Sequence, residues 1–271
     1  MKLKRRGQNS IPMSRSLRSE YRIEIREVYL MTSLFSYLPY GAAAAVPLQI
    51  KLGSRSGWYE DSADIQTVNN AEYVGEIVSQ ITYGKRELSF QCPVHASSAD
   101  NLQTEIRNIC ALFRPAKQPG KLYFKDERYI NVHPSGTPTV TDVSETFAWV
   151  TITLTAANPF WYDAGTPTVY SSGDTITNAG TYDAEVSFTA AADVITLSVG
   201  GTVTHTITAR SGQSIIGCVF TISDNAISVL NGTTNALWKA DISSQYFLIP
   251  VGQSVVTGAN NITIKQRWNG A

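Results

Sequence analysis

Residues 145–163 read ETFAWVTITLTAANPFWYD, and this stretch decides the fold that the sequence predicts. One face of the extended chain carries small and branched apolar side chains, namely Ala148, Val150, Ile152, Leu154 and Ala156. The opposite face carries aromatic and threonine side chains, namely Phe147, Trp149, Thr151, Thr153 and Thr155. This alternation predicts a long β-strand with one buried face over 145–157. The strand ends in a compact aromatic segment, Asn158-Pro159-Phe160-Trp161-Tyr162-Asp163.

The composition of the chain changes at residue 163. Residues 1–163 contain 18 basic and 16 acidic side chains, whereas residues 164–271 contain only 10 charged residues in 108. Serine and threonine account for 27 of those 108 residues. Dense threonine among alternating valine and isoleucine is typical of a β-sandwich with hydroxylated outer faces. We therefore predict two domains, residues 21–163 and 164–271, preceded by a flexible basic arm over 1–20.

The second domain is predicted to contain strands only. Gly200-Gly201 and Asn231-Gly232 are tight-turn signals between short alternating segments. The predicted strands are Glu185–Thr189, Asp193–Val199, Thr202–Thr208, Ser214–Ile222, Ala226–Leu230, Tyr246–Ile249 and Asn261–Arg267. Strands this short and closely spaced indicate a sandwich or jelly roll.

The first domain is predicted to contain one helix among strands. Apolar residues recur at helical spacing at Leu102, Ile106, Ile109 and Phe113, Ser97 or Ser98 can cap the start, and Pro115 stops the helix. A hairpin follows, with Lys121–Phe124 and Arg128–Val132 on either side of an Asp126-Glu127 turn. Glu76–Tyr83 and Glu87–Phe90 are further strand candidates.

The N-terminal fifty residues are unlike the rest of the chain. Six of residues 1–20 are lysine or arginine, and residues 21–26 then alternate between apolar and charged side chains, which suits a strand. Residues 28–50 carry no charge, but three Pro and Gly residues interrupt them, so we expect a buried or interface segment and not a membrane span. Met31 is an alternative start of translation.

No sequence pattern indicates a catalytic, cofactor-binding or metal-binding site. Cys92-Pro93-Val94-His95 is half of a zinc motif without a second pair at ligand spacing, and His133 and His205 are solitary. Neither a nucleophile elbow nor a dinucleotide fingerprint occurs. We therefore predict a protein that is not an enzyme and that needs no cofactor or metal. The three cysteines, Cys92, Cys110 and Cys218, are interpreted as small buried residues.

The overall charge argues against nucleic acid as a partner. Twenty-two basic and 22 acidic side chains give zero net charge, and only 16% of residues are charged. Such a chain has no excess positive field to gather a polyanion. A surface so sparsely charged is expected to be hydroxylated or covered by other protein.

Over residues 48–267 the order of segments resembles the distal tail protein family of long-tailed bacteriophages. The motifs that carry the resemblance are RSGWY (55–59), GKREL (84–88), the helix over 98–114, KLYFKDERY (121–129), VTITL (150–154), NPFWYD (158–163) and NAG (178–180). Residues 1–47 depart from the family pattern, since they are longer and more basic.

The resemblance implies a mainly β protein with two domains. The N-terminal domain would be a β-sandwich or barrel-like domain with one α-helix and a β-hairpin, and the C-terminal domain a galectin-like β-sandwich. The first domains would assemble into a homohexameric ring that continues the tail tube and joins it to the tip or baseplate hub. The outer domains would anchor receptor-binding components.

The resemblance also implies partners and a location. Expected partners are further copies of the chain, the tail tube protein and the hub or tip protein, with a receptor-binding protein or a host glycan as additional candidates. The expected location is the tail tip of the virion, assembled in the bacterial host cytoplasm. Candidate contacts between domains or subunits are Phe160, Trp161 and Tyr162, together with Arg128 and Tyr129 of the hairpin. Core packing between the domains is an equal alternative for the three consecutive aromatics.

Two functions of other classes stay open at this point. A carbohydrate-binding sandwich would stack a sugar on Trp238, Tyr246 or Trp268, although burial in the core is the simpler interpretation of each. A glycan-cleaving enzyme would use carboxylates that are distant in sequence.

Overall fold

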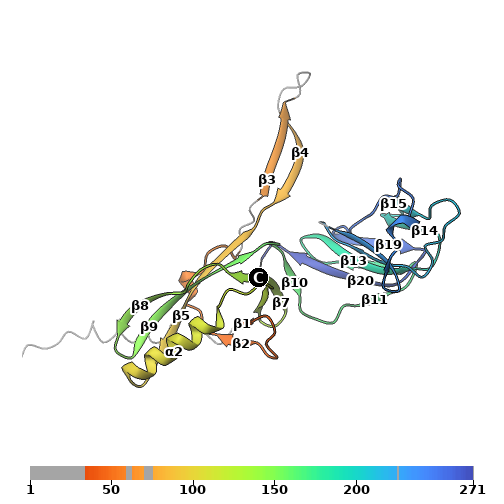
Figure 1. Cartoon of the computed structure of the whole chain (residues 1–271). Helices are drawn as coiled ribbons and strands as arrows, with labels where there is room; N and C mark the ends of the chain where they lie inside the picture. The colour runs from red at the N-terminus through yellow and green to blue at the C-terminus, as the bar shows by residue number, and fades with distance from the viewer. Residues whose placement is uncertain (1–33, 59–62, 70–75, 225, 271) are drawn as a thin grey trace, which may run out of the picture.

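The computed structural model describes residues 34–58, 63–69, 76–224 and 226–270, and it is built from antiparallel strands with a single α-helix in these ranges (Figure 1). The predicted mainly β fold is therefore confirmed. The basic arm over 1–20, the strand over 21–26 and Met31 lie outside the described residues. No helix in the described ranges is long and apolar enough to cross a membrane.

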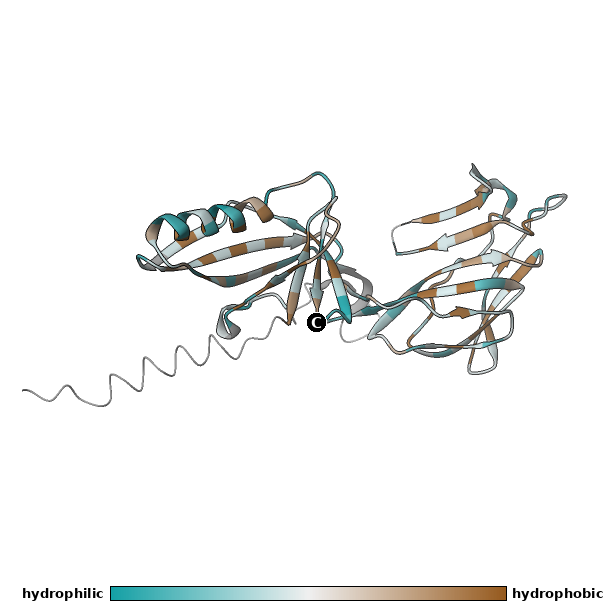
Figure 2. Ribbon diagram, turned by 90° about the horizontal axis from the view of Figure 1, so that it is seen from below, coloured by the Kyte–Doolittle hydropathy of each residue, from teal (hydrophilic) through white to brown (hydrophobic). Residues whose placement is uncertain are grey.

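The strand predicted over 145–157 is β9 (Phe147–Ala156), and it lies at the centre of the first core. It pairs along its whole length with β5 (Arg86–His95), and its other edge pairs with β8 (Thr139–Ser144). All five apolar residues of its predicted inner face are buried. The hydropathy colours of Figure 2 alternate along these strands, as expected when one face meets the core.

Strand β5 is longer than the sequence predicts. It continues past Phe90, where the sequence predicts its end, to His95. Pro93 is tolerated because, among the strands that the structure describes, only β9 pairs with β5, and a proline lacks only the N–H that would face a second neighbour.

The predicted helix is α2 (Ala99–Leu112), which lies on the core face of β5 and β9 (Figure 2). Ser98 is its cap, because the Ser98 hydroxyl accepts a hydrogen bond from the backbone N–H of Asn101 at 3.3 Å. Leu102, Ile106 and Phe113 are buried in the first core. The helix is therefore held by its apolar stripe.

The predicted hairpin is also confirmed, as β6 (Gly120–Phe124) and β7 (Arg128–Pro134). Lys125 and Asp126 both have positive φ, which is the geometry of a tight turn between two antiparallel strands. On its outer side β6 pairs with β1 (Phe35–Leu38), which pairs with β2 (Val46–Leu48). The uncharged segment thus supplies two strands, of which β2 is at the edge of the sheet, and it buries Phe35 and Tyr37 in the first core.

Residues beyond 163 form a second core between two sheets. One sheet contains β13 (Tyr182–Ala190), β16 (Val219–Ile222), β17 (Ile227–Asn231), β18 (Thr234–Asn235), β20 (Ala259–Trp268) and β11 (Val169–Tyr170). The facing sheet has the order β12 (Thr175–Asn178), β19 (Gly252–Thr257), β14 (Val194–Val199), β15 (Thr202–Thr208). Apolar residues of both sheets form the second buried cluster, which is the predicted β-sandwich.

Two predicted strands of the sandwich differ from the structure. The strand expected from Ser214 begins only at Val219. Gly217 has positive φ, and the backbone N–H of Cys218 donates to the carbonyl of Ile215, so these residues form a turn. The segment from Tyr246 to Ile249 forms only an isolated bridge, between Ile249 and Ala184. Each segment has apolar alternation, but residues 214–218 and 246–248 pair with no neighbouring strand among the described residues.

A two-stranded ribbon projects from the first domain (Figure 1). It consists of β3 (Ala63–Asn69) and β4 (Glu76–Tyr83), which form a separate sheet of their own. Within the described residues each of these strands pairs only with the other, so the outer edge of each is left unpaired.

Gly57 allows the segment after the short 3-10 helix η1 (Leu52–Ser54) to lie against β5. Its φ is +76°, and a Cβ atom there would lie 1.8 Å from the carbonyl oxygen of Glu87. We expect Gly57→Ala to lower the free energy of unfolding by about 2 kcal/mol or more, since both backbone strain and a clash oppose it. Urea denaturation measures this change.

Gly53→Ala is the matched control, because a Cβ atom at Gly53 meets no heavy atom within 4 Å. Equal stability of the two variants would contradict the close approach at Gly57.

The cysteines differ in their expected reactivity. Cys92 and Cys218 are buried and Cys110 is half-buried, and burial raises the pKa of the Cys92 thiol to about 12. At pH 8 we expect iodoacetamide to modify Cys110, while Cys92 reacts only after unfolding, because the thiolate is the nucleophile. Peptide mass spectrometry measures the modification at each site. Modification of Cys92 at the rate of Cys110 in the folded protein would contradict this.

Candidate functional site: the interdomain junction

The junction between the two cores is made by β10 (Trp161–Asp163), a strand of three residues. On one side β10 pairs with β7 of the first domain, with Tyr162 opposite Tyr129 and Asp163 opposite Arg128. On the other side it pairs with β20, with Trp161 opposite Trp268. One continuous sheet therefore runs from the first core into the second.

The three consecutive aromatics predicted as contacts are all buried, and each faces a different environment. Trp161 belongs to the first core, where its ring stacks on Trp58 with centroids 5.9 Å apart. The ring centroid of Phe160 lies 4.7 Å from that of Tyr182 on β13 and 5.3 Å from that of Tyr83 at the base of the ribbon. These contacts join the first domain, the second domain and the ribbon at one point.

Tyr162 connects the hairpin to the sandwich. Its ring lies 5.7 Å from that of Tyr129, and its hydroxyl donates to the carboxylate of Glu185 at 3.2 Å. The ammonium of Lys265 lies 3.8 Å from the ring centroid. Burial raises the pKa of the Tyr162 hydroxyl, and the nearby Glu185 charge raises it further, so the phenol stays protonated. The hydroxyl acts as a structural donor.

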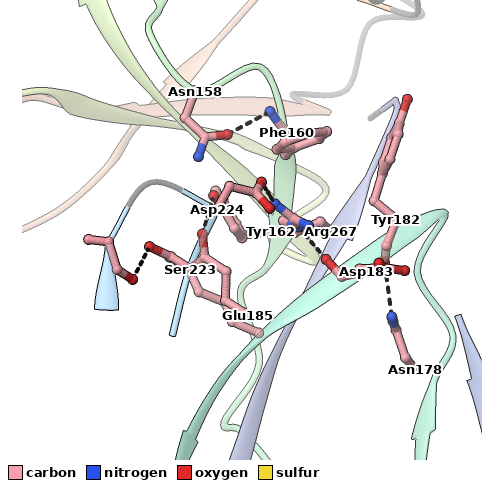
Figure 3. Close-up of polar contacts among 12 residues, drawn as sticks. Asn158, Phe160, Tyr162, Asn178, Tyr182, Asp183, Glu185, Ser223, Asp224 and Arg267 are labelled. Atoms are coloured by element: carbon pink, nitrogen blue, oxygen red, sulfur yellow. Dashed lines mark hydrogen bonds and ion pairs between the residues drawn. The ribbon is translucent and has the colours of Figure 1, made fainter. Parts of the chain in front are cut away.

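Arg267, on β20, is the charged centre of the junction. Its side chain is only 3% exposed, and its guanidinium donates to the carboxylate of Asp224 and to the backbone carbonyl of Asp183 (Figure 3). The guanidinium also lies 4.6 Å from the centroid of the Phe160 ring. A buried cation requires partners of this kind, because its desolvation is otherwise uncompensated.

Arg128 and Trp268 form the second charged contact. The guanidinium of Arg128 lies 3.9 Å from the centroid of the Trp268 ring, and it also donates to the carbonyl of Gly270 at 3.0 Å. The indole N–H of Trp268 donates to the carboxylate of Asp163 at 2.9 Å.

All five predicted residues thus lie within one cluster, but sequence reasoning missed several of their partners. The missed residues are Glu185, Lys265 and Arg267, together with Asp224, which pairs with Arg267. No local signal identifies them, because a single charged residue in a strand is ordinarily solvent-exposed. In the sequence Trp268 is only a candidate for sugar stacking, and the structure places it in the junction.

The histidines and cysteines do not converge on a ligand site in the described part of the chain. Cys92 is buried in the first core, whereas His95 lies on the exposed face of β5 against Phe147. His133 lies 3.3 Å from the carbonyl of Ala116, and His205 lies 3.1 Å from the hydroxyl of Thr204. No group of three potential ligands occurs among the residues that the structure describes.

The three candidate aromatics for sugar stacking are in different environments. Tyr246 packs against the second core and Trp268 lies in the junction. Trp238, in the short 3-10 helix η2 (Leu237–Lys239), is 56% exposed. It is the most exposed of the three, and the ammonium of Lys239 lies 5.9 Å from its ring centroid.

A family comparison covers the part of the first domain that contains the ribbon, the helix and β9. Residues 48–156 match the family described as phage tail protein RIFT-related domain. This part of the chain is a phage tail protein domain. The resemblance to phage distal tail proteins is thereby confirmed, as is the expected location in the tail of the virion. No curated protein sequence matches the chain.

Solved structures extend the likeness beyond residues 48–156 to the whole fold. The crystal structure of the SPP1 Dit protein (gp 19.1), described as a paradigm of the hub adsorption apparatus in phages that infect Gram-positive bacteria, matches with a TM-score of 0.60 and 16% identity. The match covers 86% of this chain and 98% of that one. At this identity the likeness concerns the fold, and both domains share it.

A chain of the phage p2 baseplate, in its activated conformation with strontium, matches more weakly. The TM-score is 0.42 and the identity 11%, over 88% of this chain and 99% of that one. A likeness of this strength is too weak to bear on function.

The role of Phe160 in joining the two domains is testable by truncation. We expect Phe160→Ala to lower the free energy of unfolding by about 3 kcal/mol, because it leaves a cavity between the ribbon base, β13 and Arg267. Thermal unfolding followed by circular dichroism measures the loss.

Phe147→Ala is the control, since Phe147 is half-buried on the outer face of β9. A smaller loss for Phe160→Ala than for Phe147→Ala would show that the junction contributes little to stability.

Proposed function

We propose that this phage tail protein is a structural component of the tail tip that forms a ring, joins the tail tube to the tip hub and anchors receptor-binding components. The observation that carries the proposal is the phage tail domain over residues 48–156, within a chain whose whole fold is similar to the SPP1 Dit protein. That protein is described as a paradigm of a hub adsorption apparatus. The expected arrangement is a homohexamer.

The two buried clusters support the proposed domain division. The first cluster draws on residues between Phe35 and Trp161, and the second on residues between Ile176 and Ile264. In this division residues 21–163 form the ring and residues 164–271 form the outer, galectin-like domain. Phe160, Trp161, Tyr162, Arg128 and Tyr129 then act as contacts between the domains, since their partners lie in both.

The ribbon supports self-assembly. A two-stranded sheet is only marginally stable in water by itself, and its free edges are templates for pairing with another chain. Ile65 pairs with Ile81 and Val68 with Ile77, so the ribbon is rich in apolar residues. A ring made by heterologous contacts between identical subunits would supply the missing neighbour for every copy.

A structural role without catalysis is consistent with the polar chemistry of the described residues. The charged side chains of the junction are engaged in structural hydrogen bonds and ring contacts. The proposed partners are further copies of the chain, the tail tube protein and the hub or tip protein.

Assembly is tested by particle mass and shape. At high concentration we expect particles of about six chains of 29.6 kDa, with a central opening in negatively stained images. Light scattering coupled to size exclusion gives the mass, and a mixture with tail tube protein tests whether that partner is required. A strict monomer in both conditions would contradict the ring.

The ribbon is tested by shortening it. Replacing residues 66–80 with Asn-Gly joins the paired residues Ile65 and Ile81 by a tight turn. We expect this variant to keep the circular dichroism spectrum of the fold and to lose the ring, because the arm that reaches a neighbour is gone. Trp238→Ala, on the outer domain, is the control and should keep the ring. If the shortened chain still forms rings, the ribbon is not part of the contact that assembles them.

A carbohydrate-binding outer domain is the second candidate, and the exposed indole of Trp238 favours it. An exposed aromatic face is the usual platform for a sugar ring. Binding of the full chain to a glycan array, lost in Trp238→Ala and kept in the ribbon-shortened variant, would support this function.

A further inference from the structure

The last strand of the chain leaves the second core and enters the first domain. Along most of its length β20 pairs with β13, and Ile262 and Ile264 are buried in the second core. At its end β20 pairs with β10, and Trp268 packs against the first core. Figure 1 places the C-terminus beside β7 and β10, between the two domains and away from the far end of the sandwich.

A buried arginine of the first domain holds the backbone that follows β20. Arg86 is 3% exposed, and its Nη1 donates to the carbonyl of Asn269 at 2.6 Å and to that of Trp58 at 3.3 Å. Its Nη2 donates to the side-chain carbonyl of Asn269 at 3.3 Å. One cation of β5 thus holds a segment that lies 183 residues further along the chain. Hydrogen bonds from a charged donor are the strong class, and a buried guanidinium is costly to leave without them.

Neighbouring residues of the first domain hold the same segment. Arg128 contacts both the Trp268 ring and the carbonyl of Gly270, and Asp163 accepts from the Trp268 indole. We call these six residues, Arg86, Arg128, Asp163, Trp268, Asn269 and Gly270, the C-terminal clasp.

The outer domain holds the adjoining residues from the other side. The backbone N–H of Asn269 donates to the Thr181 hydroxyl at 2.8 Å, and the N–H of Thr181 donates to the carbonyl of Arg267 at 2.9 Å. Gly180 lies so close that a Cβ atom there would be 2.5 Å from the carbonyl oxygen of Arg267. The terminal segment is therefore anchored on both domains.

We propose that residues 268–270 complete the first domain, so that the outer domain is an insertion between β10 and the end of β20 and not a C-terminal appendage. The chain then crosses between the domains twice, on two strands that are paired with each other. A single linker allows rotation about its own bonds, whereas two paired crossings resist it. The clasp thereby fixes the direction of the outer domain relative to the first, whether or not the chain forms a ring.

Hydrogen exchange on chains shortened by a few C-terminal residues tests the clasp. We compare the full chain with a chain that ends at Arg267, and use a chain that ends at Gly270 as the control. In the chain that ends at Arg267 we expect the amides of β5, β7 and β9 to exchange about tenfold faster. Without the clasp, local opening of these strands costs less free energy, because there are fewer charged hydrogen bonds to break. The amides of β14 and β19, inside the outer sandwich, should keep their rates.

Two point variants decide the matter if the shorter chain is insoluble. Arg86→Gln and Trp268→Ala should each accelerate exchange in β5 and β9, while their controls Arg114→Gln and Trp238→Ala, at exposed positions, should not. Unchanged exchange in β5 and β9, or faster exchange confined to the outer sandwich, would overturn the proposal. Neither readout depends on ring formation, so failure of the clasp and failure of the ring are distinguishable.

Discussion

The structure depends on the double pairing of β10. A strand of three residues between β7 and β20 uses both of its edges, so the first domain and the sandwich share one sheet. Because the strand is covered on both faces as well, its side chains must be apolar or must find buried partners. This constraint explains why Trp161 and Tyr162 are buried together, and why the segment before them is an aromatic run.

Buried arginines follow from the same constraint. Where two sheets merge around a short strand, backbone carbonyls at the strand ends lose their water and need donors. Arg86 donates to the carbonyls of Trp58 and Asn269, Arg267 donates to that of Asp183, and each arginine is almost fully covered. Arginine suits this role because its planar group offers five donors and stacks on aromatic faces, as Arg267 does near Phe160. The junction is thus polar in its hydrogen bonds and apolar in its packing.

Elements whose signal is local were predictable from the sequence. The strand β9 showed its period of two, α2 showed its apolar stripe with a serine cap and a proline stop, and the β6–β7 hairpin showed its polar turn. The length of strand β5 was underestimated. A proline such as Pro93 ends a strand only where its missing N–H would have to bond to a second neighbouring strand. The segment from Ser214 was overestimated because alternation does not show whether a partner strand exists.

The junction was predictable only in part. The aromatic run at Phe160 and the hairpin residues Arg128 and Tyr129 stand out in the sequence, and the structure brings them together. Other contacts around the junction join residues that are 84 or more positions apart, such as Arg267 with Asp183 and Arg86 with Asn269. A contact of this range depends on the path of the whole chain, and one isolated arginine in a strand gives no sign of it. Family resemblance supplied the architecture where periodicity could not.

The sparse charge of the second domain affects how its contacts respond to the salt concentration around a tail tip. Its outer faces are lined with hydroxyl groups, such as the pair Thr196 and Thr257, whose oxygens lie 2.6 Å apart. Dissolved ions screen the attraction between charges but leave shape and neutral hydrogen bonds nearly unchanged. Contacts made through this surface therefore keep their strength from dilute to saline surroundings, whereas a surface that recognised its partner by charge would bind differently in each.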